Sequence, residues 1–127
     1  MPEFERLPSR IRETVRAHLD NAEQVQMCAL GRSNLLYPDF VIITSSRVLV
    51  LDERPIGMLG VSYINVRCDL PFSRITSLKL SRNLTHRIFG QATIEMKVNG
   101  DTYLLCNISH NEAQRALALI SPQLDMR

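Results

Sequence analysis

"DFVIITSSRVLVLDE", residues 39–53, holds two apolar runs, Phe40–Ile43 and Val48–Leu51, separated by four polar residues. Short runs rich in valine, isoleucine and leucine that flank a small polar turn predict a β-hairpin. We expect Ser45 and Ser46 to be the two loop residues, because this choice places apolar residues opposite one another. The predicted cross-strand pairs are Ile43–Val48, Ile42–Leu49 and Val41–Val50.

The predicted hairpin is apolar on both faces. One face can line a core, and the other needs a cover, because bare apolar strands invite aggregation. The first helix of the chain or another copy of the protein could provide that cover. In the second case the hairpin forms a protein interface together with the first helix. The candidate interface residues are Phe40, Val41, Ile43, Val48 and Val50.

Thr44 and Arg47 flank the expected loop of this hairpin. A threonine at the end of one strand and an arginine at the start of the next can satisfy the backbone groups of a turn. We therefore expect both residues to hold the register of the hairpin rather than to bind a ligand.

A helix is expected on each side of the strand region. After Ser9, Ile11, Val15 and Leu19 recur every four residues, which predicts a short amphipathic helix within residues 1–20, capped by Ser9. Near the C-terminus, Ser109 and Glu112 match the Ser-x-x-Glu capping box. An apolar stripe follows them and predicts a helix over residues 109–121, ended near Pro122. The stripe consists of Ala113, Leu117 and Ile120.

Residues 23–108 read as about seven strands joined by loops at 31–39, 54–60 and 82–90. The last hairpin allows two registers. A type I′ turn at Asn99-Gly100 pairs Ile94 with Leu105, whereas the apolar alternation pairs Ile94 with Cys106. We follow the apolar alternation, which requires a three-residue loop or a bulge at the turn.

The chain of 127 residues has the length of one domain, and nothing in it indicates a second. Its net charge of +2 is too small to imply a nucleic-acid partner. No apolar run is long enough to span a membrane, and the first residues do not resemble a secretory signal. We therefore expect a cytoplasmic protein.

No catalytic, cofactor or metal site is predicted. The three cysteines, Cys28, Cys68 and Cys106, lie far apart without a Cys-x-x-Cys pair, so we expect buried, reduced thiols. A catalytic thiol or hydroxyl would need an orienting histidine. The three histidines are expected on the polar sides of the two helices and in a basic loop; they are His18, His110 and His86.

Positive charge concentrates between Arg67 and Lys97, a segment that contains six Arg or Lys residues and two acidic residues. Its densest part is "KLSRNLTHR", which is either a solvated loop or a surface attracted to anionic lipid or an acidic partner. The loop "GRSNLLYPD" carries an apolar tip that either tucks against the domain or enters a membrane interface or a partner's pocket. The candidate anion and lipid contacts are Lys79, Arg82, His86, Arg87, Leu35, Leu36 and Tyr37.

Three segments together carry a family resemblance: "VIITSSRVLVLDE" (41–53), "LPFSRITSLKL" (70–80) and "ISHNEAQRALALI" (108–120). The first is similar to the strand, Thr-x-x-Arg turn and strand of bacterial pleckstrin-homology-like domains, a group that also resembles GRAM domains. The second and third resemble a following strand and the closing helix of that family. The resemblance extends from about Leu7 to Ile120.

This resemblance implies a mainly β fold: a strongly bent antiparallel barrel with one open end plugged by the C-terminal helix. It also implies an oligomerisation or protein-interaction module without enzymatic activity. Phosphoinositide-binding relatives carry several basic residues around the first hairpin loop, whereas this chain offers Arg32 alone there. We therefore expect a self-associating or protein-binding module, with peripheral binding to anionic membranes as the alternative.

Overall fold

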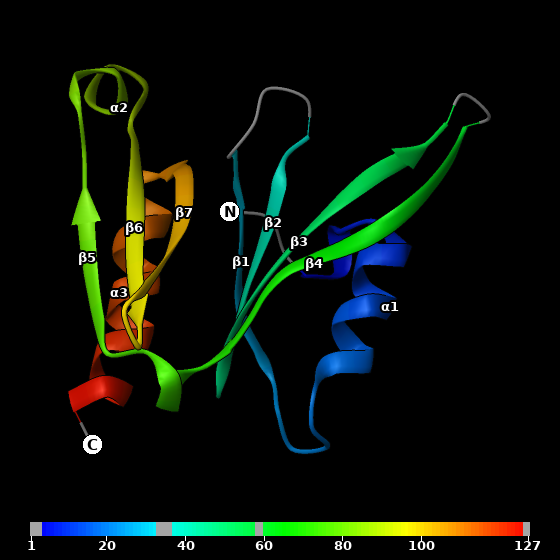
Figure 1. Ribbon diagram of the computed structural model, residues 1–127, viewed down its shortest axis with the longest axis horizontal. Helices are drawn as coiled ribbons and strands as arrows, with labels where there is room; N and C mark the ends of the chain where they lie inside the picture. Colours follow the sequence, from blue (N-terminus) through cyan, green and yellow to red (C-terminus); the bar gives the residue numbers. More distant parts are fainter. Residues whose placement is uncertain (1–3, 33–36, 58–59, 126–127) are drawn as a thin grey trace.

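The computed structural model describes residues 4–32, 37–57 and 60–125, which form two antiparallel sheets and three α-helices (Figure 1). The first sheet has the order β1-β2-β3-β4, with β1 (Val25–Gly31), β2 (Asp39–Thr44), β3 (Arg47–Ile56) and β4 (Val61–Pro71). The second has the order β5-β6-β7, with β5 (Ser77–Ser81), β6 (Gln91–Val98) and β7 (Asp101–Ser109). The helices are α1 (Ser9–His18), α2 (Leu84–Phe89) and α3 (His110–Asp125), with 3-10 turns η1 (Phe4–Arg6) and η2 (Phe72–Arg74).

The β2–β3 hairpin has the predicted register: Ile43 lies opposite Val48, Ile42 opposite Leu49 and Val41 opposite Val50. Alternate residues of a strand point to opposite faces of the sheet. The two sets of apolar side chains therefore enter two different clusters. They divide the interior of the protein into a core between the sheets and a core beneath α1.

The larger core lies between the two sheets. The β2–β3 hairpin contributes Val41, Ile43, Val48 and Val50 to it. Helix α3 closes this core with Ala113, Ala116 and Ile120, which are all buried. The sheets bend around these side chains without closing into a complete barrel. The resemblance implied this bent antiparallel arrangement with the C-terminal helix at one end, and the structure confirms it.

The smaller core lies between α1 and the other face of the hairpin. Ile11 and Val15 of α1 are fully buried there against Ile42, Leu49 and Leu51. Of the two covers considered for this face, the first helix is therefore the one that the structure contains. Four of the proposed interface residues, Val41, Ile43, Val48 and Val50, lie in the core between the sheets, and Phe40 is half-buried against the α1 cluster. These side chains pack within one copy of the chain.

The register expected for the last hairpin is wrong. Ile94 pairs with Leu105 and Met96 with Tyr103, as a two-residue Asn99-Gly100 turn requires. Both turn residues have positive φ, 51° and 91°. The bulge lies at the other end of the hairpin, where Asn107 has a φ of 56°. The bulge returns Ile108 to the buried face, and Cys106, expected to point inward, is only half-buried.

The seam between the two sheets depends on Gly31. The amide of Arg32 donates to the carbonyl of Cys106 at 2.7 Å, which ties the end of β1 to β7. A Cβ atom on Gly31 would lie 2.7 Å from the same carbonyl oxygen. Since real Cβ atoms do not approach an oxygen so closely, the seam requires glycine at this position.

Several predicted boundaries also change. Pro8 precedes α1, and Ser9 is its first residue rather than its cap. Helix α3 continues through Pro122 to Asp125, although Glu112 does donate its amide to the Ser109 hydroxyl at 3.3 Å. Residues 54–56 of the segment expected as a loop over 54–60 belong to β3, which extends to Ile56, and β4 begins at Val61.

Truncation of the α1 side chains tests whether this helix is the required cover. We expect Ile11→Ala to lower the free energy of unfolding by about 3 kcal/mol, because it removes a fully buried side chain. Urea denaturation followed by circular dichroism measures this change. Glu13→Ala, on the exposed side of the same helix, is the control and should change stability by less than about 0.5 kcal/mol. Equal stability of both variants would show that α1 is not needed to cover the hairpin.

Candidate interaction surfaces

The basic segment expected as a loop contains helix α2. Asn83 is its N-cap and accepts a hydrogen bond from the His86 amide at 2.8 Å. His86 Nδ1 accepts from the Asn83 amide at 3.1 Å, so histidine takes the place that Glu or Gln has in a usual capping box. Gly90 ends the helix with a φ of 67°. The two sequence signals for this helix were therefore Asn83 three residues before His86, and Gly90 after it.

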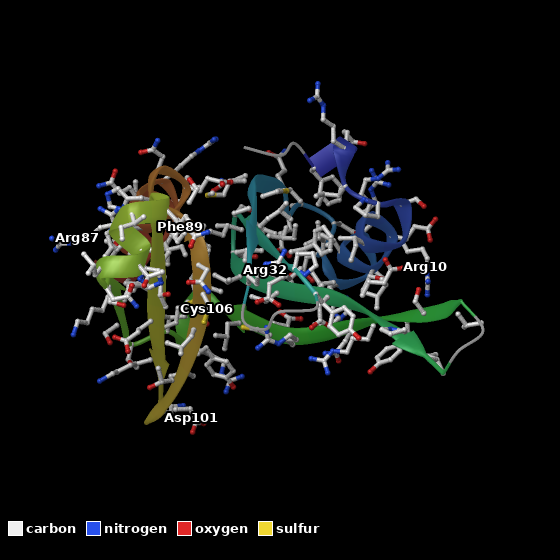
Figure 2. The ribbon with its side chains drawn as sticks, turned by 90° about the horizontal axis from the view of Figure 1, so that it is seen from above. Arg10, Arg32, Arg87, Phe89, Asp101 and Cys106 are labelled. Atoms are coloured by element: carbon white, nitrogen blue, oxygen red, sulfur yellow. The ribbon has the colours of Figure 1, made fainter. Side chains whose placement is uncertain are left out.

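The outer side of α2 carries three large apolar side chains. Leu84, Ile88 and Phe89 are exposed by 75%, 69% and 69%, and they are the most exposed large apolar residues of the described chain. Arg87 belongs to the same helix and projects away from the rest of the molecule (Figure 2). We name Leu84, Arg87, Ile88 and Phe89 the α2 patch. It places apolar and cationic groups side by side.

The other predicted anion contacts have different surroundings. His86 is buried, and its Nε2 lies 2.8 Å from the Asn107 side-chain oxygen, so the ring connects α2 to the bulge of β7. Arg82 donates from Nε to the carbonyl of Gln91 at 2.9 Å. Lys79 is exposed on β5, opposite Glu95 of β6. Of the four basic candidates, Arg87 is thus the one that stands on the exposed surface of α2.

The apolar loop tip falls partly outside the described residues. Leu35 and Leu36 belong to the segment 33–36, which the structure does not describe. Tyr37 is described and half-buried. The prediction of a contact at this tip therefore stays a prediction.

A second apolar surface lies on the far end of the β3–β4 hairpin. The pairing of β2 with β3 ends at Leu51, whereas the pairing of β3 with β4 continues to Ile56 opposite Val61. The hairpin therefore extends beyond the sheet as a two-stranded ribbon (Figure 1). Ile56, Val61 and Tyr63 are exposed there by 52%, 54% and 42%. Their positions in the register put them on one face, which we name the hairpin patch.

The opposite face of the same ribbon is held by α1. Arg10 donates to the hydroxyl and to the carbonyl of Ser62, both at 2.7 Å, and the Ser62 hydroxyl donates to Glu53 at 2.8 Å. On the hairpin-patch face, Arg54 contacts both oxygens of the fully buried Asp52 carboxylate at 3.2 Å. Since this charge is paired, the hairpin patch is mainly apolar.

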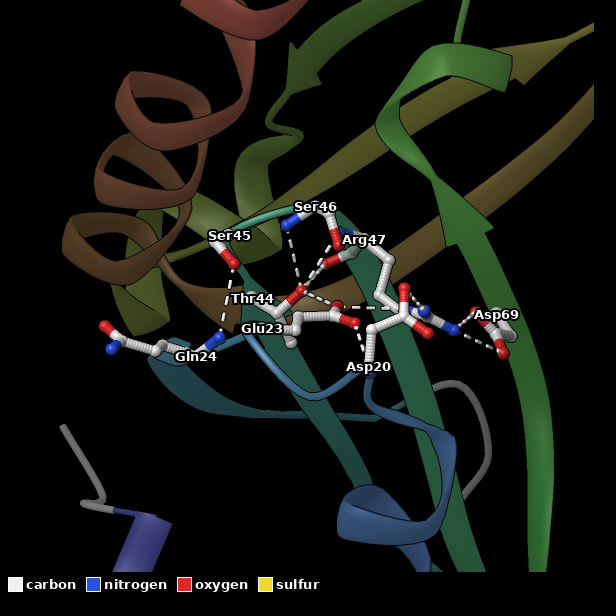
Figure 3. A network of polar contacts seen from close by, with 8 residues as sticks. All are labelled: Asp20, Glu23, Gln24, Thr44, Ser45, Ser46, Arg47 and Asp69. Atoms are coloured by element: carbon white, nitrogen blue, oxygen red, sulfur yellow. Dashed lines mark hydrogen bonds and ion pairs between the residues drawn. The ribbon is translucent and has the colours of Figure 1, made fainter.

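The turn between β2 and β3 is fixed by a network of polar contacts (Figure 3). The Thr44 hydroxyl donates to the Glu23 carboxylate and accepts from the amides of Ser46 and Arg47 at 3.1 and 2.9 Å. Arg47 donates to Glu23 at 2.9 Å and lies 3.3 Å from both oxygens of Asp69. Thr44 and Arg47 therefore have the structural role expected from the sequence. A single guanidinium among several carboxylates makes this turn a poor site for an anion.

Burial makes the three thiols poor nucleophiles. Burial raises the pKa of Cys28 and of Cys68 to about 11, and burial also raises the pKa of Cys106. These thiols are therefore protonated and weakly nucleophilic at neutral pH. Across residues 4–32, 37–57 and 60–125, no three His, Cys, Asp or Glu side chains are grouped as a metal site would require. No helix within those ranges has the length and apolarity to cross a bilayer.

Comparisons with known proteins agree with the fold. Residues 19–121 match the family model of the bacterial PH domain. A DUF1696 family protein with a pleckstrin-homology domain from Shewanella loihica PV-4 is similar in structure, with 14% identity, a TM-score of 0.57, and coverage of 89% of this chain and 92% of that one. A pleckstrin homology domain from Shewanella amazonensis SB2B gives 14% identity, a TM-score of 0.57, and coverage of 87% and 94%. None of the curated proteins matches the sequence.

The turn network predicts a specific loss of stability in acid. Burial raises the pKa of Glu23, but hydrogen bonds from Thr44, from the Asp20 backbone and from Arg47 outweigh it and lower this pKa from 4.5 to about 2. Glu23 therefore stabilises the fold above about pH 4.5, and this stability is lost as the pH falls towards 2. We expect Glu23→Gln to remove about 2 kcal/mol of the change in unfolding free energy between pH 5 and pH 2.

Urea denaturation at a series of pH values measures this slope for both proteins. Glu13→Gln is the matched control, because Glu13 is exposed on α1, and its slope should equal that of the parent protein. An unchanged slope in Glu23→Gln would contradict the stabilising role given to this carboxylate.

Proposed function

This chain belongs to the bacterial PH domain family, and we propose that it is a non-enzymatic interaction module that associates with a second copy of itself through the hairpin patch. The observation that carries the proposal is the two-stranded end of the β3–β4 hairpin, with Ile56, Val61 and Tyr63 exposed on one face. A two-stranded ribbon is only marginally stable by itself in water. A partner that covers the apolar face would stabilise it.

The neighbouring edge supports association between copies. In the described chain β4 is an edge strand, and its first six residues, Val61–Val66, include no charged residue. Natural sheets usually protect a long edge strand with lysine, proline or a charged side chain that points inward. Because an interface around a two-fold axis places the same surface against itself, a patch without net charge is suited to it. A second copy would therefore place its own hairpin patch and β4 edge against those of the first.

The low reactivity of the three buried thiols supports the non-enzymatic part of the proposal. His86, which a catalytic dyad could have used, is occupied in the cap of α2 and in its contact with Asn107. The raised thiol pKa values favour structural cysteines. An activity of the purified protein that is lost in Cys106→Ser would contradict this part of the proposal.

Binding to anionic membranes is the second candidate, and the α2 patch favours it. Exposed leucine, isoleucine and phenylalanine side chains beside an arginine can enter a bilayer interface while the guanidinium meets lipid phosphates. The positive balance between Arg67 and Lys97 would add long-range attraction. This surface contains none of the hairpin-patch residues, so the two candidates can be tested by separate variants.

Self-association is tested by the solution mass measured with light scattering on a sizing column, over a hundredfold range of protein concentration. We expect a mass well above the 14.5 kDa of one chain at high concentration, falling towards it on dilution. The double variant Val61→Lys, Tyr63→Lys should weaken association by at least about tenfold, because like charges would meet in the interface.

The matched control for this experiment is Leu84→Lys, Ile88→Lys, which makes the same change on the α2 patch. It should leave the oligomer unchanged. A parent protein of 14.5 kDa at every concentration, or equal weakening by both double variants, would contradict association through the hairpin patch.

Membrane binding is tested by co-sedimentation with phosphatidylserine-containing vesicles and with neutral phosphatidylcholine vesicles. We expect binding to the anionic vesicles alone, weakened by salt. Ile88→Ser, Phe89→Ser should reduce it at least about tenfold, and Arg87→Gln by about fivefold, the effect of about 1 kcal/mol per basic residue. Val61→Ser, Tyr63→Ser makes the same change on the hairpin patch and is the control with an intact α2 patch. Absence of binding at low salt would eliminate this candidate.

A further inference from the structure

A cavity opens between the two sheets, on the side where β4 faces β7. Its volume is about 380 Å³, which lies within the range of small-molecule sites in proteins. The walls come from β3, β4, β6 and β7, and consist of Val50, Arg67, Cys68, Met96, Thr102, Tyr103, Leu104, Leu105 and Cys106. The hairpin patch and the α2 patch contribute no residue to this lining, so the cavity is a separate feature of the molecule.

The cavity follows from small side chains and from two irregular strands. The pairing of β3 with β4 shifts at Val50, and the bulge that results leaves Arg67 outside the regular ladder. In β7, the observed register leaves Cys106 only half-buried. Valine and two cysteines thus stand where larger side chains would fill the space between the sheets. A space that the side chains of the protein leave unfilled is one that a ligand can occupy.

The deep wall of the cavity is apolar. Val50, Met96 and Leu105 belong to the core between the sheets and are buried. The two thiols add soft, polarisable sulfur atoms. Because burial raises their pKa, they are uncharged at neutral pH. Apolar walls of this composition favour a ligand that leaves water without losing strong hydrogen bonds.

The charged residue of the cavity lining, Arg67, is paired with Asp39, which is not part of the lining. Arg67 donates from Nη1 to the Asp39 carboxylate at 2.7 Å, and the Asp39 side chain is only 3% exposed. Both charges act on Cys106, where Asp39 raises the thiol pKa and Arg67 lowers it. An anionic ligand beside Arg67 would be attracted by the guanidinium and repelled by the Asp39 carboxylate. A neutral ligand avoids this opposition.

From these observations we propose that the cavity between β4 and β7 is a binding site for a small, neutral, apolar molecule of about two or three aromatic rings in size. The ligand would lie against Val50, Met96 and Leu105, with Cys68 and Cys106 beside it. This site goes beyond the proposed association and needs neither interaction patch.

The dye N-phenyl-1-naphthylamine is a suitable probe, because it is neutral, apolar and fluorescent in apolar surroundings. Titration of the folded protein should give saturable binding at one dye per chain. The dye 1-anilinonaphthalene-8-sulfonate has nearly the same rings with an added sulfonate, and it should bind at least about tenfold more weakly. Absence of saturable binding by the neutral dye, or equal affinity for both dyes, would overturn the proposal.

Two further measurements locate the bound dye. Cys106→Phe places a ring at the half-buried edge of the cavity and should lower the affinity for the neutral dye at least about tenfold, whereas Asn111→Phe on the exposed start of α3 should not. In the parent protein, the dye should slow alkylation of Cys68 and Cys106 by iodoacetamide and leave the rate at Cys28 unchanged, because Cys28 lies beneath α1. Equal binding by Cys106→Phe, or no protection of either cavity thiol, would place the dye elsewhere and refute the site.

Discussion

The β2–β3 hairpin buries apolar side chains on both of its faces, and the rest of the fold is arranged so that each face is covered. A hairpin with one apolar face needs one cover, whereas this one needs two. The second sheet and α3 cover the face that carries Val41 and Val48, and α1 covers the face that carries Ile42 and Leu49. The Thr44–Glu23–Arg47 network fixes the turn and thus decides which side chains point to each face.

The candidate functional surfaces lie where these covers end. Helix α1 and the β1–β2 strands extend only partly along the β3–β4 hairpin, so its far end keeps an apolar face towards solvent. Helix α2 connects two strands of the second sheet and buries little besides His86. The cavity between β4 and β7 opens where the two sheets diverge. The two patches lie outside both cores, whereas the cavity borders the core between the sheets.

Sequence patterns predicted the parts of this fold in which two independent signals agree. In the β2–β3 hairpin, a two-residue turn and the matching of two continuous apolar runs require the same register, and that register is observed. In the β6–β7 hairpin the two signals conflict, and the Asn99-Gly100 turn prevails because the bulge at Asn107 absorbs the conflict several residues away. A bulge of this kind leaves no apolar pattern, so alternation alone could not locate it.

The candidate sites were less predictable for a related reason. Leu84, Ile88 and Phe89 have the composition of core residues, and only the tertiary structure shows that they face solvent. Conversely, Val41 and Val50 were candidates for an interface because the sequence could not tell which cover lies over which face. The four basic candidates follow one another closely in sequence, yet a strand, a cap and a short helix direct them to different surroundings.

In this structure α1 and the second sheet cover the hairpin within one copy, and we propose that a partner covers only its far end. Hydrogen–deuterium exchange at two protein concentrations, a hundredfold apart, distinguishes these two kinds of cover. We expect strong protection of the amides in 41–43 and 48–51 at both concentrations, and protection of the amides in 53–56 and 61–64 that rises with concentration. Protection of 41–51 that depends on concentration, or protection of 61–64 that does not, would contradict this expectation.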